Sequence, residues 1–292
     1  MKTLLITGSE GFIGSHLVKH LNDRYKIIHF DKVIGKDLRF KEEIEEVFKK
    51  YKIDCVVHLA GYAGVRPSIE KPLIYLDDNV RSTMNLLEVM KEYHCNKIVF
   101  ASSSSVYGNN FLNKPSSETD TKNPISPYAY TKSTIEDMLK LYHETFGMDS
   151  ISTRFFTVYG PNQRKDLAIS KFIKAIKEDS EIHVYGDGTQ SRDYTYIDDI
   201  VNGLERSIKL VIKNNICECI NLCSSKPISV NKLLDKLFEI SGKEVKIIYE
   251  DNKIGDVNLT YGNNKKAKEL LHWSPKVSIN EGLKLQYFSN QK

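Results

Sequence analysis

A glycine-rich stretch near the N-terminus constrains the fold of this chain more than any other feature. The apolar segment 2–7 predicts a strand, and Gly8-Ser9-Glu10-Gly11-Phe12-Ile13-Gly14 follows it and opens a predicted helix over 11–22. In such a unit the first glycine permits the tight turn, the second lets dinucleotide phosphates approach the backbone, and the third lets helix and strand pack closely. The helix N-terminus adds partial positive charge. We therefore expect a dinucleotide-binding α/β fold in which the cofactor contacts Gly8, Gly11, Phe12, Ile13 and Gly14.

An acidic residue stands where this interpretation requires one. Asp31 ends the second predicted strand, 26–30. A carboxylate there can accept both ribose hydroxyls of NAD and would repel the extra phosphate of NADP, although a helix cap or turn residue is the alternative. Lys32 weakens the preference, because a base could bind that phosphate. We expect NAD, with Asp31 and Lys32 in its site.

The pattern after this unit predicts the rest of the fold. Further strands are expected over 53–59, 97–102 and 150–155, and further helices over 40–50, 73–92 and 128–146. Alternating strands and helices favour a Rossmann-type doubly wound parallel sheet. We assign residues 1–160 to an NAD-binding domain, to which the chain returns near 190–222, for example as a strand over 217–222. Shorter elements after Gly160 predict that residues 161–292 form mainly a smaller, mixed α/β substrate-binding lobe.

Composition excludes several classes of protein. The formal net charge is only +4 and the lysines are scattered, which argues against nucleic-acid binding. The chain has no run of 18 apolar residues, so we expect no membrane span. Gly8-Ser9-Glu10-Gly11 interrupts the N-terminal apolar run before it reaches the length of a signal peptide, so we expect a cytoplasmic protein.

The five cysteines are an odd number, which makes a disulfide framework improbable in a chain of this size. Cys217, Cys219 and Cys223 lie close enough in sequence to suggest a metal site. An alternating strand is the simpler interpretation, because no histidine lies at zinc-ligand spacing from them. We expect no bound metal.

The Tyr-x-x-x-Lys spacing marks the candidate catalytic pair. Only Tyr128/Lys132 begins a long predicted helix after Ser126-Pro127 and lies downstream of a serine-rich strand end. Positions i and i+4 share one helix face, so Lys132 can lower the pKa of the phenol and bind the nicotinamide ribose. Tyr128 is then a candidate general base; the alternative is a surface tyrosine with a solvated lysine. The same spacing also occurs, with no such context, at Tyr93/Lys97, Tyr249/Lys253 and Tyr261/Lys265.

Further motifs follow in the order typical of one enzyme family. They include His58-Leu59-Ala60-Gly61, Asn79-Val80, Ser102-Ser103-Ser104-Ser105-Val106-Tyr107-Gly108, Arg154-Phe155-Phe156-Thr157-Val158-Tyr159-Gly160-Pro161 and Tyr185-Gly186-Asp187-Gly188. With the glycine stretch and Tyr128/Lys132, they make nearly the whole chain resemble the extended short-chain dehydrogenases/reductases. The resemblance implies that Ser103 supplies the catalytic hydroxyl and that Asp37-Leu38 contacts adenine. It also implies cofactor contacts from Leu59, Ala60, Gly61, Asn79, Ser102, Tyr128, Lys132 and Phe155.

The same resemblance bears on assembly and on the reaction. Helices 73–92 and 128–146 resemble the pair that builds a dimer interface in this family, so a homodimer is expected. Family members share oxidation of the sugar 4-hydroxyl by NAD. The dehydratases carry Asp-Glu after the catalytic hydroxyl, and the decarboxylases carry glutamate at the second position. This chain has Ser104 and Ser105 there, which leaves 4-epimerisation through a 4-keto intermediate.

Three segments resemble UDP-glucuronate 4-epimerases in particular: 63–68, 156–161 and 163–168. Thr157 stands where UDP-galactose 4-epimerases usually have asparagine. We expect Ser104, Ser105, Thr157 and Arg164 to bind the C6 carboxylate, although the serines could merely cap a turn and Arg164 could face solvent.

Other residues are expected to bind the nucleotide part of a UDP-sugar. Arg192 suits the diphosphate, because its planar fork matches paired phosphate oxygens, with an ion pair to Asp193 or Asp199 as the alternative. Arg66 and Tyr185 are further candidates, and Lys253 is a weaker one. The rival functions are a UDP-glucose/UDP-galactose 4-epimerase, a nonenzymatic NAD-binding regulator and a reductase with net hydride transfer.

Overall fold

The centre of the molecule is a six-stranded parallel sheet. A computed structural model describes residues 1–109, 114–251 and 257–289. The strand order is β2-β1-β3-β4-β5-β9, and every neighbouring pair is parallel. The order reverses between β1 and β3, which is where doubly wound sheets bind ligands at their carboxyl ends. The Rossmann-type fold expected from the sequence is confirmed.

The sheet contains β1 (Thr3–Thr7), β2 (Lys26–Phe30), β3 (Cys55–His58), β4 (Lys97–Ser103), β5 (Asp149–Phe155) and β9 (Cys217–Leu222). The helices near it are α1 (Phe12–Leu21), α2 (Lys41–Lys50), α3 (Val65–Glu70), α4 (Pro72–Tyr75), α5 (Ser82–Glu92), α6 (Pro127–Phe146), α8 (Ile197–Lys213) and α10 (Lys265–Leu271). The strands fall within two residues of the predicted ends.

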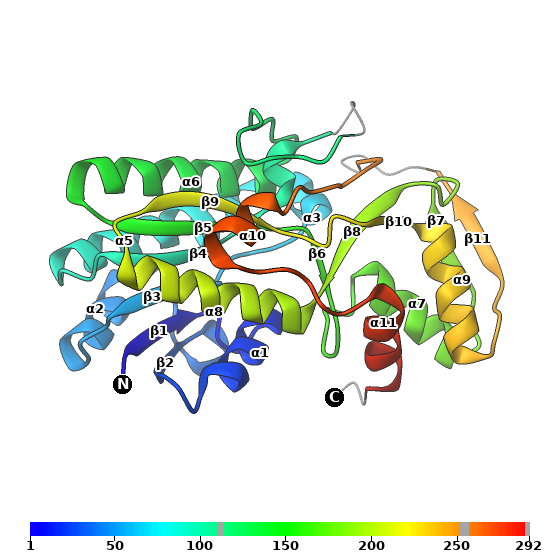
Figure 1. The fold of residues 1–292 in the computed structure, drawn as a ribbon, viewed down its shortest axis with the longest axis horizontal. Coiled ribbons are helices and arrows are strands. Elements are labelled where there is room, and N and C mark those ends of the chain that lie inside the picture. Colours follow the sequence, from blue (N-terminus) through cyan, green and yellow to red (C-terminus); the bar gives the residue numbers. More distant parts are fainter. Residues whose placement is uncertain (110–113, 252–256, 290–292) are drawn as a thin grey trace.

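Helices cover both faces of this sheet (Figure 1). Successive β1 residues point to opposite faces, so Leu4 and Ile6 belong to one buried core and Leu5 to the other. The first core includes Leu17 of α1 and Leu204 of α8, and the second includes residues of α2, α5 and α6. Burial on both faces explains why the strands read as continuous apolar runs.

A smaller mixed lobe follows the main sheet. It contains the three-stranded sheet β10 (Pro227–Ser229), β8 (Ser191–Tyr196) and β6 (Thr157–Tyr159), and the pair β11 (Ile247–Glu250) and β7 (Ile182–Tyr185). Its helices are α7 (Ala168–Lys177), α9 (Val230–Ser241) and α11 (Ile279–Phe288). Within the described residues the chain returns to the main sheet as α8 and β9, and later as α10, which contacts both. The boundary at residue 160 stays a prediction.

One predicted helix is interrupted. The single helix expected over 73–92 was wrong: it divides into α4, the π-helical segment η2 (Leu76–Arg81) and α5. The Ser82 hydroxyl donates to the carbonyl of Asp77, five residues earlier, at 3.1 Å. The wider π turn carries Asn79, whose side chain is buried in the cofactor region described below. Such local widening is frequent at functional sites.

The cysteine-rich segment is a strand, as the simpler interpretation predicted. Cys217–Leu222 forms β9, and the Cys217 thiol lies 3.2 Å from the Ser150 hydroxyl of the neighbouring β5. Among the described residues, no three His, Cys, Asp or Glu side chains are grouped to hold a metal ion. Within the same ranges, no helix has the length and apolar character needed to cross a membrane.

Candidate active site

The glycine stretch forms a close-fitting turn at the start of α1. Gly8 has φ +71, and a Cβ on it would lie 2.7 Å from the backbone nitrogen of Ala60. A Cβ on Gly14 would lie 1.9 Å from the carbonyl oxygen of Gly8. Both positions therefore require glycine. The absence of side chains here leaves the N-terminus of α1 open to anionic phosphates, so the local structure fits a dinucleotide.

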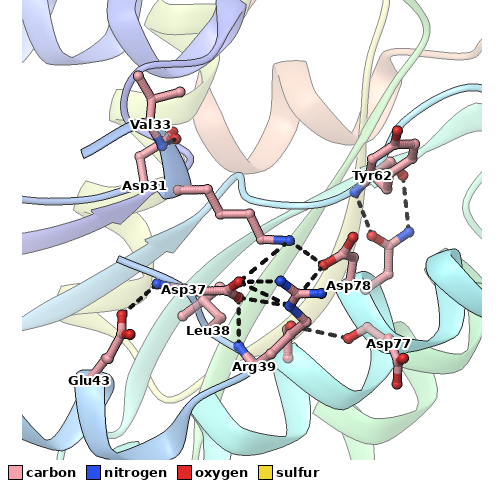
Figure 2. Close-up of polar contacts among 12 residues, drawn as sticks. Asp31, Val33, Asp37, Leu38, Arg39, Glu43, Tyr62, Asp77 and Asp78 are labelled. Carbon is pink, nitrogen blue, oxygen red and sulfur yellow. Dashed lines mark hydrogen bonds and ion pairs between the residues drawn. The ribbon is translucent and has the colours of Figure 1, made fainter. Parts of the chain in front are cut away.

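Asp31 connects the end of β2 to this loop. One carboxylate oxygen accepts from the backbone N–H of Glu10 at 3.0 Å, and the other from that of Val33 at 2.9 Å. Asp31 thus caps the short 3₁₀ turn that follows β2 (Figure 2), which was the alternative interpretation. Through Glu10 it also holds the glycine loop in place. Each oxygen keeps acceptor capacity for a ribose hydroxyl.

Lys32 and Asp37 lie in a cluster of ion pairs beside Asp31. Lys32 is paired with Asp78 and lies 3.8 Å from Asp37, whose carboxylate also accepts from the Arg39 guanidinium at 2.6 Å (Figure 2). Partial burial opposes ionisation of Asp37, but hydrogen bonds from Arg39 and the charge of Lys32 lower its pKa overall. Leu38 is buried in the core. Sequence reasoning missed Arg39 and Asp78, although both adjoin predicted cofactor residues.

The Leu59-Ala60-Gly61 segment approaches Asn79 and the catalytic helix. The Asn79 amide accepts from the Tyr62 N–H at 2.6 Å and donates to Thr131 of α6 at 3.0 Å. A Cβ on Gly61 would lie 3.0 Å from the Asn79 side chain and 3.5 Å from Lys132 Nζ. The structure therefore brings three predicted cofactor contacts, Gly61, Asn79 and Lys132, to one place.

Tyr128, Lys132 and Ser103 also converge. Ser126 caps α6 by accepting from the Ala129 N–H at 3.1 Å, which places Tyr128 in the first turn. Lys132 Nζ donates to the carbonyl of Ala101 at 2.8 Å and lies 6.0 Å from the centre of the Tyr128 ring. The Ser103 hydroxyl, at the end of β4, is a hydrogen-bond partner of the phenol.

The electrostatics correct one expectation. Burial raises the pKa of Tyr128 above its ordinary value, and the Ser103 hydrogen bond and the charge of Arg164 only partly oppose this. Burial also lowers the pKa of Lys132 to about 8, while Glu136 acts to raise it. The expected lowering of the phenol pKa is therefore not seen: burial outweighs Ser103 and Arg164, and Lys132 is not among the groups that shift the pKa of Tyr128. A lowering by Lys132 stays a prediction.

A buried network behind the pair was missed at the sequence level. Glu136 accepts from the Ser102 hydroxyl at 2.6 Å and from two nitrogens of Arg154, at 2.9 and 2.8 Å. Arg154 also donates to the Tyr107 hydroxyl at 2.8 Å. Ser102 thus belongs to this hydrogen-bond network, and it directly precedes Ser103 in β4. Glu136 follows Lys132 by four residues on α6, a spacing that could have identified it.

The residues expected at the sugar lie around the same strand ends. The Ser103 hydroxyl oxygen accepts from the Ser105 N–H at 3.1 Å and lies 3.1 Å from the Ser105 hydroxyl, in the 3₁₀ turn that contains Ser104. Phe155 is the register partner of Ser103 across β4 and β5, and Thr157 follows in β6. Arg164 pairs with Asp166 at 2.7 Å and is near enough to lower the pKa of Tyr128. Ser105 is thus hydrogen-bonded to Ser103, and Arg164 acts electrostatically on Tyr128.

The predicted nucleotide-binding residues lie in both lobes. The Arg66 guanidinium of α3 stacks over the Tyr185 ring of β7, 4.5 Å from its centre. Arg192 of β8 donates to the carbonyls of Ser191 and Asn258 at 3.0 and 3.4 Å. Lys253 lies outside the described residues.

Residues 4–219 match the model of the NAD dependent epimerase/dehydratase family. This chain belongs to that family. Its cofactor is therefore NAD, and the open glycine loop and Asp31 are consistent with that cofactor. The family, together with the retained Tyr128, Lys132 and Ser103, makes the chain an NAD-dependent enzyme rather than a nonenzymatic regulator.

The chain is similar to several named proteins. It is 40% identical to a UDP-glucuronate 4-epimerase of Thermodesulfobacterium geofontis, over 96% of this chain and 93% of that one. Among solved structures, UDP-glucose 4-epimerase of Thermotoga maritima gives a TM-score of 0.92 at 32% identity, covering 98% and 97% of the two chains. UDP-glucuronic acid 4-epimerase of Bacillus cereus, in complex with UDP-glucuronic acid and NAD, gives 0.90 at 34% identity, covering 98% of both.

Replacing Ser103 by alanine tests the proposed acid–base geometry. Because the Ser103 hydrogen bond lowers the Tyr128 pKa, its loss should raise that pKa and move the rising limb of the kcat/KM pH profile to higher pH. We also expect kcat to fall by roughly a hundredfold. Ser103→Thr keeps the hydroxyl and should restore most of the wild-type profile. An unshifted limb in Ser103→Ala would remove the hydroxyl from the account.

Proposed function

We propose that this protein is an NAD-dependent UDP-sugar 4-epimerase that interconverts UDP-glucuronate and UDP-galacturonate. The observation that carries the proposal is the convergence of Tyr128, Ser103 and Lys132 beside a turn that has serines at 104 and 105. The similarity to named UDP-sugar 4-epimerases, over nearly the full length of the chain, supports the reaction.

The chemistry at C4 needs one base and one orienting hydroxyl. Ser103 orients the sugar 4-hydroxyl while Tyr128 takes its proton, and the same phenol returns the proton once the 4-keto sugar has turned its other face. NAD⁺ bound beside these residues would supply the hydride acceptor for the first half of the reaction and, in its reduced form, the hydride donor for the second. Lys132 is available to hold the ribose of that cofactor.

The serine turn argues for epimerisation over elimination or decarboxylation. The resemblance implies that dehydratases and decarboxylases of this family carry a carboxyl group after the catalytic hydroxyl. Here Ser105 is hydrogen-bonded to Ser103, and Ser104 lies in the same 3₁₀ turn. Both side chains end in hydroxyls, so neither position supplies the carboxyl group that those two reactions use in the family. The keto sugar is therefore left to be reduced again.

Arg164 supports a uronate as the substrate. Its guanidinium lies 3.6 Å from the position of a Cβ on Gly64 and acts electrostatically on both Tyr75 and Tyr128. A cation beside the reacting centre suits a C6 carboxylate. The 4-keto uronate is a β-keto acid that loses carbon dioxide readily when its scissile bond aligns with the carbonyl orbitals. Binding of the carboxylate by Ser104, Ser105, Thr157 and Arg164 would hold that bond out of line.

UDP-glucose is the second candidate substrate. The similarity to the Thermotoga maritima UDP-glucose 4-epimerase, at a TM-score of 0.92, favours it. Asp166 already pairs with Arg164, so the cation is partly neutralised unless a carboxylate displaces that partner. We place the uronate first, because a C6 carboxylate could accept hydrogen bonds from all four proposed ligands. A neutral C6 hydroxymethyl group would use only some of them.

Competition between the two sugars tests the assignment. Purified protein with equal UDP-glucuronate and UDP-glucose should form UDP-galacturonate first, as followed by NMR. Arg164→Ala should lose uronate turnover at least tenfold more than hexose turnover. Arg81→Ala is the control, because Arg81 is also an exposed arginine that pairs with a nearby aspartate, Asp77, four residues earlier. Dominant UDP-galactose in wild type, or equal losses in Arg164→Ala, would contradict the uronate assignment.

We propose that the chain forms a homodimer through α5 and α6. Met84 of α5 and Tyr130, Leu141 and Phe146 of α6 are exposed large apolar side chains, and such a surface is typical of an interface. Sedimentation equilibrium should give a dimer for wild type and a shift toward monomer for Leu141→Glu. A monomeric wild type would contradict the proposal.

The cysteines support a cytoplasmic location. All five are free in the structure, and three of them are buried. Unpaired thiols persist in reducing compartments. We therefore propose a cytoplasmic enzyme, and cell fractionation with an antibody against the chain tests this.

A further inference from the structure

The ion cluster beside Asp31 contains two cations and two acids. Lys32 and Arg39 supply the cations, and Asp37 and Asp78 supply the carboxylates. Asp78 pairs with Lys32 and lies 3.6 Å from the Arg39 guanidinium. Asp37 contacts the same two cations (Figure 2). Each acid is therefore shared between both bases.

These cations stand where the choice between NAD and NADP is made. In dinucleotide-binding folds, a carboxylate at the end of the second strand accepts the ribose 2′-hydroxyl, whereas a nearby arginine accommodates the 2′-phosphate. This chain carries both kinds of residue: Asp31 is the carboxylate, Lys32 follows it directly, and Arg39 lies in the same cluster. Judged from its bases alone, the site would accept a 2′-phosphate.

The two acids are placed more firmly than the two bases. The Asp78 and Asp37 side chains are 7% and 14% exposed, whereas those of Lys32 and Arg39 are 49% and 41% exposed. Asp78 also precedes Asn79, whose amide is fixed by Tyr62 and Thr131. The two carboxylates are therefore held in place by their surroundings, and the more exposed Lys32 and Arg39 side chains pack against them. The two positive and two negative charges of this cluster cancel. With Asp31 included, the group of five charged residues carries a net negative charge.

We propose that Asp78 is a cofactor-selectivity residue that keeps Lys32 and Arg39 neutralised and so prevents the site from accepting NADP. It contributes through the two bases, since its carboxylate contacts them directly. Without it, Asp37 alone would face the two cations, and the group of five charged residues, Asp31 included, would change from net negative to neutral. The repulsion of a 2′-phosphate would then be lost. The inference concerns the cofactor and holds for either sugar.

Nucleotide exchange measures this selectivity without relying on activity. The purified enzyme is incubated to equilibrium with equal, excess NAD⁺ and NADP⁺, freed of unbound nucleotide, and denatured, and the released nucleotides are separated by chromatography. Wild type should carry almost only NAD⁺. Asp78→Asn, which keeps the shape of the side chain, should raise the bound NADP⁺/NAD⁺ ratio by roughly tenfold.

Two variants separate a local effect from a general one. Asp77→Asn makes the same charge change one residue away, at a side chain that is 57% exposed and pairs with Arg81, and should leave the ratio unchanged. Asp78→Glu retains the charge and should also keep the wild-type ratio. Adding Lys32→Gln to Asp78→Asn should cancel much of the gain, because the freed base has then been removed.

The result that overturns the proposal is an unchanged ratio in folded Asp78→Asn, or an equal rise in Asp77→Asn. If Asp78→Asn does not fold, Asp37→Asn removes the other acid shared by Lys32 and Arg39 and should raise the ratio in the same direction. An unchanged ratio there would equally overturn the account.

Discussion

The buried pair of Glu136 and Arg154 joins the elements on which the site depends. Glu136 lies on α6, Arg154 on β5, and the Ser102 hydroxyl at the end of β4 donates to the same carboxylate. All three side chains are buried. Loss of one partner from a buried pair of this kind costs about 3–5 kcal/mol, because it leaves an uncompensated charge. The pair therefore fixes the catalytic helix against two strand ends at once.

The Glu136–Arg154 pair also determines where the proposed catalytic side chains lie. Lys132 is one turn before Glu136 on α6 and reaches the Ala101 carbonyl of β4, while Ser103 follows Ser102 and reaches the phenol of Tyr128. On the cofactor side, the glycine turn and the π-helical segment place Asp31 and Asn79 at the edge where the strand order reverses. Fixed backbone geometry, rather than flexible loops, thus positions most of the proposed site.

Local sequence signals predicted the elements well where one periodicity applied throughout. The glycine turn, the parallel strands and the capped start of α6 are local, and the structure has them within two residues. The interruption at 76–81 was not predictable, because the π segment covers only six residues, too few to change the helical pattern of the whole stretch. The raised pKa of Tyr128 was also missed: a one-dimensional pattern gives the neighbouring charge but not the burial that outweighs it.

Long-range pairing explains the other residues that were missed. Asp78, Arg39 and Lys32 are separated by up to 46 residues and meet only in the folded chain, where η2 brings Asp78 to Lys32. In the sequence, Lys32 weakened the expectation of NAD, because a free base could bind the 2′-phosphate of NADP. Its partners reverse that interpretation, since a base that is held by two carboxylates is not available to a phosphate.

The fate of the hydrogen at C4 tests the central claim, that a single site oxidises and re-reduces the same carbon. UDP-glucuronate labelled with deuterium at C4 would be incubated with the enzyme in ordinary water and the products followed by NMR. The account predicts UDP-galacturonate that keeps the deuterium at C4. Loss of the label to solvent, or a pentose product formed with release of carbon dioxide, would contradict it.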